Sequence, residues 1–434
     1  MSAAGWGHSA RWVVPVLVAS YLLAAIVCCA LAATGQAHFV DLHVYRMGGD
    51  AVLRGDAALP SQAAASGGGL YSLRFAGLPF TYPPFAAVVF TALAAVPWTV
   101  AAAAVTAGSA AALIVLLYLA LRLPPVSSWL DSRTAWRLAL AVAVAAIWLE
   151  PVRTALGYGQ IDLFLALGVL YDVALPDAAR HKGAVIGIAA GIKLTPAIFA
   201  VYLLATRRYR AAAMAAAAFA ATIAAGFAVL PASSARYWGA IFLNPRHVAP
   251  VQDAENQSLL GALARTMHTA SVGFVWLPLA LGTAALGLAV AARAHRTGNE
   301  ALGFSACAVT GLLVSPISWT HHWVIAIPAL LLAAVPVCRR HPADGVSGKV
   351  TGAVAVAAAA VLGWTRVARA APGTGWLHLP AFGLARSLVY VVAGLVGLGF
   401  AAAAVTRRAP RPPGSTSSTG ETCRTEGLLA ANHP

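Results

Sequence analysis

Charge is scarce in this chain of 434 residues: only 10% of the residues are Asp, Glu, Lys or Arg, and 60% are hydrophobic. Soluble domains carry about 25% charged and roughly 45–50% apolar residues. The composition therefore excludes a sizeable water-soluble domain. It predicts an all-α polytopic membrane protein, because a helix needs about 20 apolar residues to cross a bilayer. Such stretches recur between Trp12 and Arg407.

The common soluble-enzyme signatures are also absent. The sequence has no Walker A loop, no dinucleotide-binding glycine fingerprint, no HExxH motif and no CxxC pair. Its five cysteines have no metal-ligand spacing and imply no disulfide framework. Nucleotide-activated substrates are not supplied outside the cytoplasm, so an enzyme working there would use a donor held in the bilayer.

The net charge of +15 comes from arginines that cluster in short loops beside apolar spans. This is the pattern of cytoplasmic loops, so it indicates membrane topology and not a nucleic-acid partner. We expect a plasma-membrane protein with both termini in the cytoplasm and about twelve transmembrane or re-entrant helices joined by short extracytoplasmic loops. We expect residues 1–408 to form one membrane domain, with outer loops 34–82 and 231–272 around a cleft, and residues 409–434 to be a disordered cytoplasmic tail.

Only 14 residues are acidic, and Asp41 is the one nearest to a helix end in the first predicted outer loop. A rigid span would hold its carboxylate near the lipid headgroups. From position alone, the residue is either a base at the outer membrane surface or a solvated or helix-capping aspartate.

The run Lys193-Leu194-Thr195-Pro196 interrupts an apolar segment. Proline lacks an amide donor and disfavours helix at the residue before it, so we expect two half-length helices to meet here. Lys193 would then lie at membrane depth, where a charged side chain needs a partner.

Three further polar groups are candidates for ligand contacts. His321 and His322 lie in a predicted outer turn; adjacent helical histidines diverge by about 100°, so they suit a phosphate contact or a structural pair better than a metal pair. The amide-rich run 250–258 suits a sugar or inositol polyol. Gln160 or Asp162, after a glycine-flanked break, could face a cavity.

The order of these motifs carries a resemblance to a known family. The motifs are Asp41 with Tyr45, Phe80-Thr81-Tyr82-Pro83-Pro84, Gly157-Tyr158-Gly159-Gln160, the break at Lys193, Asn256-Gln257-Ser258, and Ser315 to His322. Across residues 12–405 their order resembles the polyprenyl-phosphate-mannose-dependent α-1,2-mannosyltransferases of glycosyltransferase family 87.

The resemblance implies a GT-C-type glycosyltransferase fold whose catalytic aspartate maps onto Asp41. It implies transfer of mannose from polyprenyl-phosphate mannose to a phosphatidylinositol mannoside on the outer face. Forming an α-1,2 linkage from a β-linked donor is an inversion, which needs one base. We expect no cofactor, no metal, no nucleic acid and a monomer among membrane lipids. Hypothetical donor-phosphate contacts are Lys193, His321 and His322, and hypothetical acceptor or sugar contacts are Tyr82, Gln160, Glu255, Asn256, Gln257 and Trp319.

Three other functions fit parts of the sequence. A transporter or flippase of lipid-linked sugars would also need buried charges such as Lys193 and Asp162. A lipid-linked glycan ligase would also use an outer-face base, and a structural membrane subunit would need neither. Sugar transfer that depends on Asp41 separates a transferase from a carrier.

Overall fold

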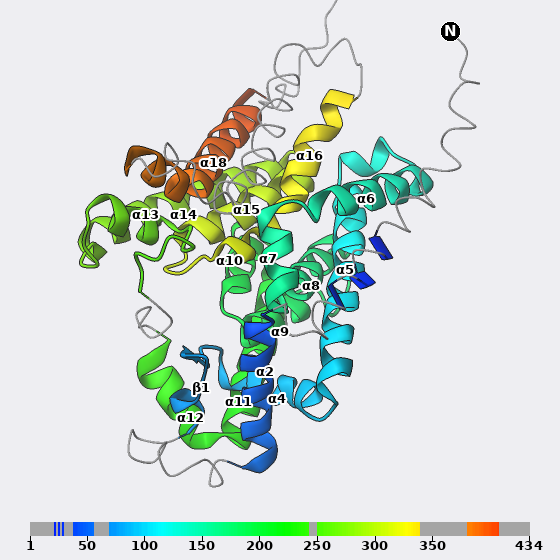
Figure 1. Ribbon diagram of the computed structural model, residues 1–434. Helices are drawn as coiled ribbons and strands as arrows, with labels where there is room; N and C mark the ends of the chain where they lie inside the picture. Colours follow the sequence, from blue (N-terminus) through cyan, green and yellow to red (C-terminus); the bar gives the residue numbers. More distant parts are fainter. Residues whose placement is uncertain are drawn as a thin grey trace, which may run out of the picture.

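The computed structural model describes residues 21–22, 25–26, 28–29, 38–55, 69–242, 250–338 and 380–407. Most of the predicted first span, the predicted span 350–366 and the predicted tail 409–434 lie outside these residues. The described part is almost entirely helical (Figure 1). Its two strands, β1 (Arg74–Phe75) and β2 (Leu78–Pro79), form a short antiparallel hairpin.

The described α-helices are, in chain order, α2 (Val40–Arg54), α4 (Pro84–Ala94), α5 (Trp98–Leu121), α6 (Ser132–Ala146), α7 (Glu150–Tyr158), α8 (Asp162–Ala174), α9 (Ala184–Ile192), α10 (Ile198–Ala205), α11 (Tyr209–Val229), α12 (Pro231–Arg236), α13 (Leu259–Thr266), α14 (Gly273–Arg296), α15 (Glu300–Val314), α16 (Ile327–Cys338) and α18 (Pro380–Arg407). Short 3-10 turns are η3 (Leu70–Ser72), η4 (Val126–Ser128), η5 (Thr195–Ala197) and η8 (Thr320–Ala326), and η6 (Tyr237–Ile241) is a π turn.

Four described helices are long and apolar enough to cross a membrane: α5, α11, α14 and the Ser387–Thr406 part of α18. The pair α6 and α7 would make a fifth, bent by 77° at its break. Several shorter apolar helices, among them α4 and α15, lie beside them. The chain is thus an apolar helical protein with membrane-spanning capacity, and about twelve transmembrane or re-entrant segments remains a prediction.

The predicted break at Pro196 is confirmed. Helix α9 ends at Ile192, Lys193 has extended backbone dihedrals, and the chain resumes as η5 and then α10. The proline occupies the first turn of the new helix, where its missing N–H costs no hydrogen bond. Two half-length helices therefore meet at Lys193.

Helix α2 is held by two close approaches that only glycine allows. Gly49 packs against the backbone of α4, where an added Cβ would lie 2.4 Å from the Phe90 carbonyl oxygen. Gly159 ends α7 with a φ of 68°, and a Cβ there would lie 2.8 Å from side-chain atoms of Phe39 and Leu42. Glycine adopts this left-handed conformation without a steric penalty. The first turn of α2 therefore lies directly on the end of α7.

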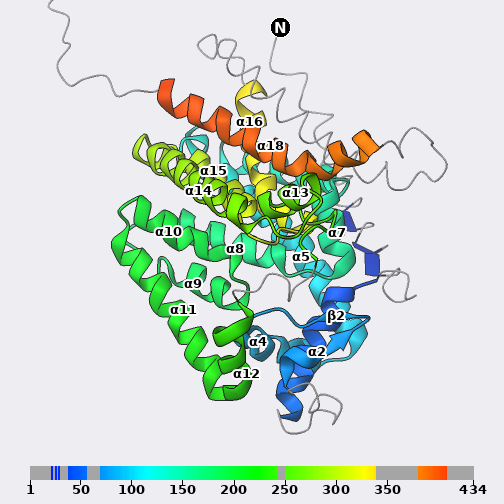
Figure 2. The same ribbon diagram turned by 90° about the vertical axis from the view of Figure 1, so that its left-hand side faces the viewer.

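The apolar residues of the described part form one large and two smaller buried clusters. The large one joins α5 to α10 with α14, α15, α16 and α18, and the second surrounds α2 and α4. The smallest contains Val251, Leu260, Ala264, Val272 and Ile317. Figure 2 shows α18 over α14 and α15, with α8 and α10 below them and α2, α4 and α12 at the far end. Ile161 belongs to the second cluster and Leu163 to the large one, so Asp162 lies where these two clusters meet.

Candidate active site

A cavity of about 1060 Å³ is lined by residues that belong to the three clusters or pack against them. Its lining includes eight of the residues that the sequence singled out: Asp41, Tyr82, Gln160, Lys193, Glu255, Trp319, His321 and His322. Its other walls are mostly apolar. The structure therefore brings together side chains that are separated by up to 281 positions from Asp41 to His322 in the sequence.

Asp41 lies in the first turn of α2 and is partly buried on the cavity wall. The N-cap position belongs to Phe39, whose N–H donates to the carbonyl oxygen of Gly157. The capping and fully solvated alternatives for Asp41 are therefore wrong. The N-terminal end of a helix favours a carboxylate, and the contact with α7 directs this one to the cavity.

Burial raises the pKa of Asp41 to about 7. A hydrogen bond from Gln160 and the charge of Lys193 lower this pKa, whereas the charges of Asp162 and Glu255 raise it further. Removal from water disfavours the charged form of a carboxyl group, and here that effect is the largest. A carboxylate with a pKa near neutrality suits a general base, because it is basic enough to take a proton and still ionised at physiological pH.

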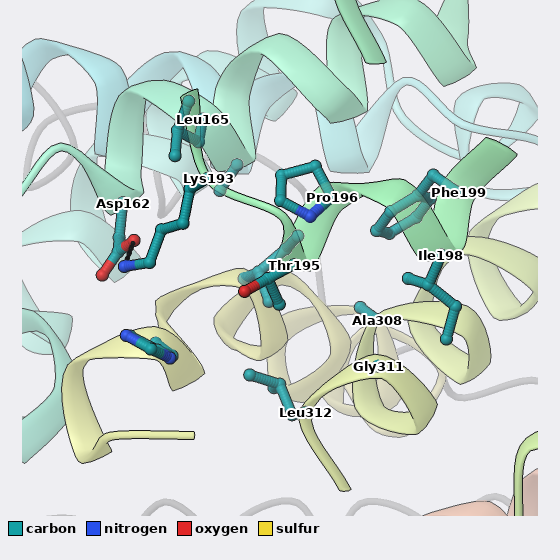
Figure 3. A pocket seen from close by; sticks show the side chains of 13 residues that line it. Asp162, Leu165, Lys193, Thr195, Pro196, Ile198, Phe199, Ala308, Gly311 and Leu312 are labelled. Carbon is teal, nitrogen blue, oxygen red and sulfur yellow. Dashed lines mark hydrogen bonds and ion pairs between the residues drawn. The ribbon is translucent and has the colours of Figure 1, made fainter. Parts of the chain in front are cut away.

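Lys193 has found a partner in Asp162. Its Nζ lies 2.6 Å from Asp162 Oδ1, and both side chains are about nine-tenths buried (Figure 3). Asp162 is the first residue of α8 and Lys193 follows the last residue of α9, so both helix dipoles favour the charges placed there. The expectation that Lys193 needs a charged partner is confirmed, and its depth in the membrane stays a prediction.

Below this ion pair is a second, smaller cavity of about 40 Å³, shown in Figure 3. Thr195, Pro196 and Leu312 line it together with Asp162 and Lys193. Lys193, at the break between α9 and α10, thus lines both the large and the small cavity. Asp162 Oδ2 has no hydrogen-bond partner within the described part of the chain.

The two histidines lie at the start of η8, with ring centroids 4.8 Å apart. His321 Nε2 is 3.0 Å from Gln160 Nε2 and 4.0 Å from Asp162 Oδ2. For Nδ1 of both His321 and His322, the described residues supply no hydrogen-bond partner. The buried imidazoles therefore have ring nitrogens available to a ligand.

One group of residues at the cavity has the composition of a metal site. Asp162, His321 and His322 each offer a ligand atom, and these atoms lie within 4.8 Å of one another. The expectation that adjacent histidines diverge too far to share a ligand is therefore wrong, because one ligand atom of each imidazole lies within 4.8 Å of the other and of the Asp162 carboxylate. However, the Lys193 ammonium already lies on the same carboxylate and would repel a divalent cation.

Glu255 and Trp319 reach the cavity because two loops pair. Trp319 forms an antiparallel bridge with Asn256, and the N–H of Thr320 donates to the carbonyl oxygen of Glu255. Both side chains line the cavity and are partly exposed to it.

Asn256 and Gln257 are placed differently from the sequence expectation. Both are buried and neither lines the cavity. Asn256 donates to backbone carbonyls of Val251 and Pro316 and accepts from the N–H of Ser318, while Gln257 donates to the carbonyls of Ala254 and Ser387. Their amides brace the loops that present Glu255, and we assign them no sugar contact.

Sequence reasoning did not assign a role to Tyr45. This side chain is fully buried, and its hydroxyl donates to Gln160 Oε1 over 2.6 Å and lies 3.1 Å from the Tyr82 hydroxyl. The spacing in the sequence could have indicated a role: Tyr45 follows Asp41 by four residues, which puts both side chains on one face of a helix.

Comparison with known proteins identifies the family. The glycosyltransferase family 87 model matches residues 80–316, more than half of the chain. A relative in Mycolicibacterium smegmatis is 34% identical over 401 residues, covering 89% of this chain and 90% of the relative. The chain belongs to glycosyltransferase family 87. That relative is a polyprenol-phosphate-mannose-dependent alpha-(1-2)-phosphatidylinositol pentamannoside mannosyltransferase, and a Mycobacterium tuberculosis protein of the same description is 34% identical over 389 residues, covering 86% of this chain and 83% of the relative.

A second type of family 87 relative is similar over a shorter stretch. The polyprenol-phosphate-mannose-dependent alpha-(1-2)-phosphatidylinositol mannoside mannosyltransferase of M. smegmatis is 34% identical over 318 residues, covering 69% of this chain and 71% of the relative. Among solved structures, ArnT from Cupriavidus metallidurans bound to undecaprenyl phosphate gives a TM-score of 0.37 at 16% identity, covering 92% of this chain and 77% of ArnT. That score is too low to support an inference, so the GT-C-type fold remains a prediction.

Proposed function

We propose that this family 87 enzyme transfers mannose from polyprenyl-phosphate mannose to a phosphatidylinositol mannoside, on the outer face of the membrane. The new linkage is α-1,2 and forms with inversion, and Asp41 is the general base. The observation that carries the proposal is the composition of the cavity: a carboxylate, a lysine and two histidines line it together, and most of its other walls are apolar. The similarity to mannosyltransferases that use this donor supports it.

The base acts on the acceptor. As the sugar hydroxyl attacks the anomeric carbon of the donor, the C–O bond to phosphate breaks and Asp41 takes the hydroxyl proton. A single displacement of this kind inverts the configuration, from a β-linked mannosyl phosphate to an α-mannoside. Tyr82, Glu255 and Trp319 line the same cavity and are the proposed acceptor contacts.

The leaving group is a polyprenyl phosphate, whose negative charge grows as the bond breaks. Lys193 lies on the cavity wall, and His321 and His322 lie beside it with unpaired ring nitrogens. Preorganised donors in a water-poor site stabilise such a developing charge without having to reorganise. Asp162 keeps Lys193 in place and neutralises it before the donor binds.

The apolar wall fits the lipid part of the donor. The same cavity is lined by apolar side chains of α10, α14 and the end of η6, namely Ile198, Val201, Ala284, Leu288 and Phe242. Val201 and Phe242 are more than one-third exposed, so this part of the cavity opens at the surface of the helical bundle. A polyprenyl chain would bury apolar surface there while its phosphate reaches Lys193.

The proposed orientation rests on where the arginine-rich segments meet. Arg208 pairs with Glu300 and lies 3.9 Å from Asp177, and Arg293 donates to the carbonyl oxygen of Val405. These contacts join the segments around Asp177, Arg208 and Glu300, which the sequence predicts to be cytoplasmic, and the end of the last predicted span beside Arg407. The polar residues Asp41, Glu255 and Trp319 of the cavity come from predicted outer segments, which is the arrangement that the positive-inside rule favours.

Reconstitution into vesicles separates the proposal from a transporter or flippase. Purified protein is given labelled polyprenyl-phosphate mannose and phosphatidylinositol mannosides of different sizes. A labelled glycolipid product supports the transferase, and movement of the intact labelled donor between leaflets without a product supports the carrier. Transfer of a preassembled oligosaccharide but no single mannose would support a ligase.

The rate is expected to depend on pH through Asp41. Because the base must be ionised and its pKa is about 7, kcat/KM should rise about tenfold per pH unit below neutrality and level off above it. The measurement is initial-rate transfer at several pH values in one lipid composition. A rate that stays flat from about pH 5 to about pH 9 would contradict the assignment of Asp41 as the base.

Transfer is expected to need no divalent metal. Lys193 supplies the positive charge that a metal would otherwise bring to the leaving phosphate. Enzyme treated with a chelator and passed through metal-free buffer should keep its full rate. Loss of activity on chelation, with recovery on addition of zinc, manganese or magnesium, would show instead that Asp162, His321 and His322 hold an ion.

A further inference from the structure

A chain of hydrogen bonds runs across the cavity wall from Tyr82 to His321. The Tyr45 hydroxyl donates to Gln160 Oε1, and since it has one hydrogen, the Tyr82 hydroxyl must donate to Tyr45 across their 3.1 Å contact. Gln160 Nε2 lies 3.0 Å from His321 Nε2. Gln160 is buried between these partners, and it joins side chains from three parts of the chain.

The orientation of the Gln160 amide follows from its neighbours. Gln160 Oε1 accepts from the Tyr45 hydroxyl, so its NH₂ group is the end that faces His321. Only one N–H is used by His321, and the other is available to Asp41, which lines the same cavity and whose pKa Gln160 lowers.

The amide in turn decides the protonation of the imidazole. His321 Nε2 accepts from Gln160, so the proton of the neutral ring is on Nδ1. That Nδ1 is buried, and no residue in the described ranges accepts its proton. The ring is thus held as a donor without an acceptor, beside the ammonium group that would face the leaving phosphate.

We propose that Gln160 is a positioning residue that couples the two halves of the reaction: held by Tyr45, it orients Asp41 with one N–H and with the other fixes His321 as the tautomer that donates to the donor phosphate. This inference rests on the proposed function of the cavity. It gives Gln160 a role different from the sugar contact that its position in the sequence suggested.

The test compares wild type with Gln160→Met, which keeps the size of the side chain and removes both ends of the amide. We expect kcat/KM to fall by about 10- to 100-fold, because both the base and the phosphate donor lose their orientation. The acidic limb of the pH profile should also move to higher pH. The titratable and charged groups that would still act on Asp41 are Tyr45, Tyr82, Asp162, Lys193, Glu255, His321 and His322.

Two more variants test the direction of the hydrogen bonds. Gln160→Glu replaces the NH₂ by an acceptor, so His321 should carry its proton on Nε2, which ¹⁵N chemical shifts of labelled histidine report directly. Tyr45→Phe removes the donor to the amide oxygen of Gln160. It should therefore increase the share of His321 with its proton on Nε2, but by less than Gln160→Glu does. Thr310→Val is the control, because Thr310 is an equally buried polar side chain that donates to the carbonyl oxygen of Ala306 in its own helix and does not line the cavity.

The inference would be overturned if Gln160→Met kept the wild-type rate and pH profile, or if His321 in the wild type carried its proton on Nε2. Neither result would affect the proposed function as long as the wild type transfers mannose. Conversely, absence of transfer by the wild type would overturn the proposed function, while the histidine spectra would still report the tautomer.

Discussion

Replacing Asp41 with asparagine is expected to reduce mannosyl transfer by about 10²- to 10⁴-fold, the range that a general base contributes. The amide keeps the shape of the carboxyl group and its place in the first turn of α2, but it cannot take the proton of the acceptor hydroxyl. Binding of both lipids should change little, so the loss should appear in kcat. The measurement is initial-rate transfer by the purified variant in lipid.

The stability of Asp41→Asn gives an independent check that the loss is chemical. The raised pKa of Asp41 means that the folded protein binds the proton more tightly than the unfolded chain does, so the charged carboxyl destabilises the fold as pH rises from about 4 to about 7. The neutral variant should therefore unfold no more readily than wild type above neutral pH. Asp50→Asn, on the same helix and exposed in a pair with Arg54, is the matched control and should keep full activity.

Lys193→Met is expected to lower kcat by about 10²- to 10³-fold. This is the usual effect of removing one preorganised donor that stabilises a developing negative charge. It should also destabilise the protein by about 3–5 kcal/mol, since it leaves the buried Asp162 carboxylate without its partner. Thermal unfolding and single-turnover transfer measure the two effects separately.

A second substitution separates these two effects. In Lys193→Met with Asp162→Asn, no buried charge is left unpaired, so most of the stability should return while transfer stays slow. Lys182→Met is the matched control: this lysine is also buried, pairs with Asp177 at 2.9 Å and does not line the cavity. Full activity in the double variant would contradict a role for Lys193 in meeting the phosphate charge.

Some of the site could be predicted because the signal is local. Proline at position 196 disfavours helix at the residue before it, and the resulting break leaves Lys193 between two half-length helices. The position of Asp41 beside a helix start is likewise readable from its neighbours. The apolar segments 99–121 and 161–175 likewise predict α5 and α8 to within one residue at each end.

The partners of these residues could not be predicted, because they come from helices far apart in the sequence. Lys193 contacts Asp162, 31 positions away in the sequence, and Tyr45 contacts Gln160, 115 positions away. Whether such side chains meet depends on how the helices pack. Gly159 allows one such contact, yet a glycine in a sequence does not say which helix will approach it. Polarity alone misled at Asn256, since an amide suited to a sugar hydroxyl is equally suited to a backbone carbonyl.

The most direct test of the central claim is the structure of the product formed by the purified enzyme from polyprenyl-phosphate mannose and a phosphatidylinositol mannoside. NMR of the isolated glycolipid gives both the anomeric configuration and the position of the new bond. The account predicts one added mannose, α-linked to a 2-hydroxyl, formed by wild type and not by Asp41→Asn. A β-linked product, or equal product from both proteins, would contradict it.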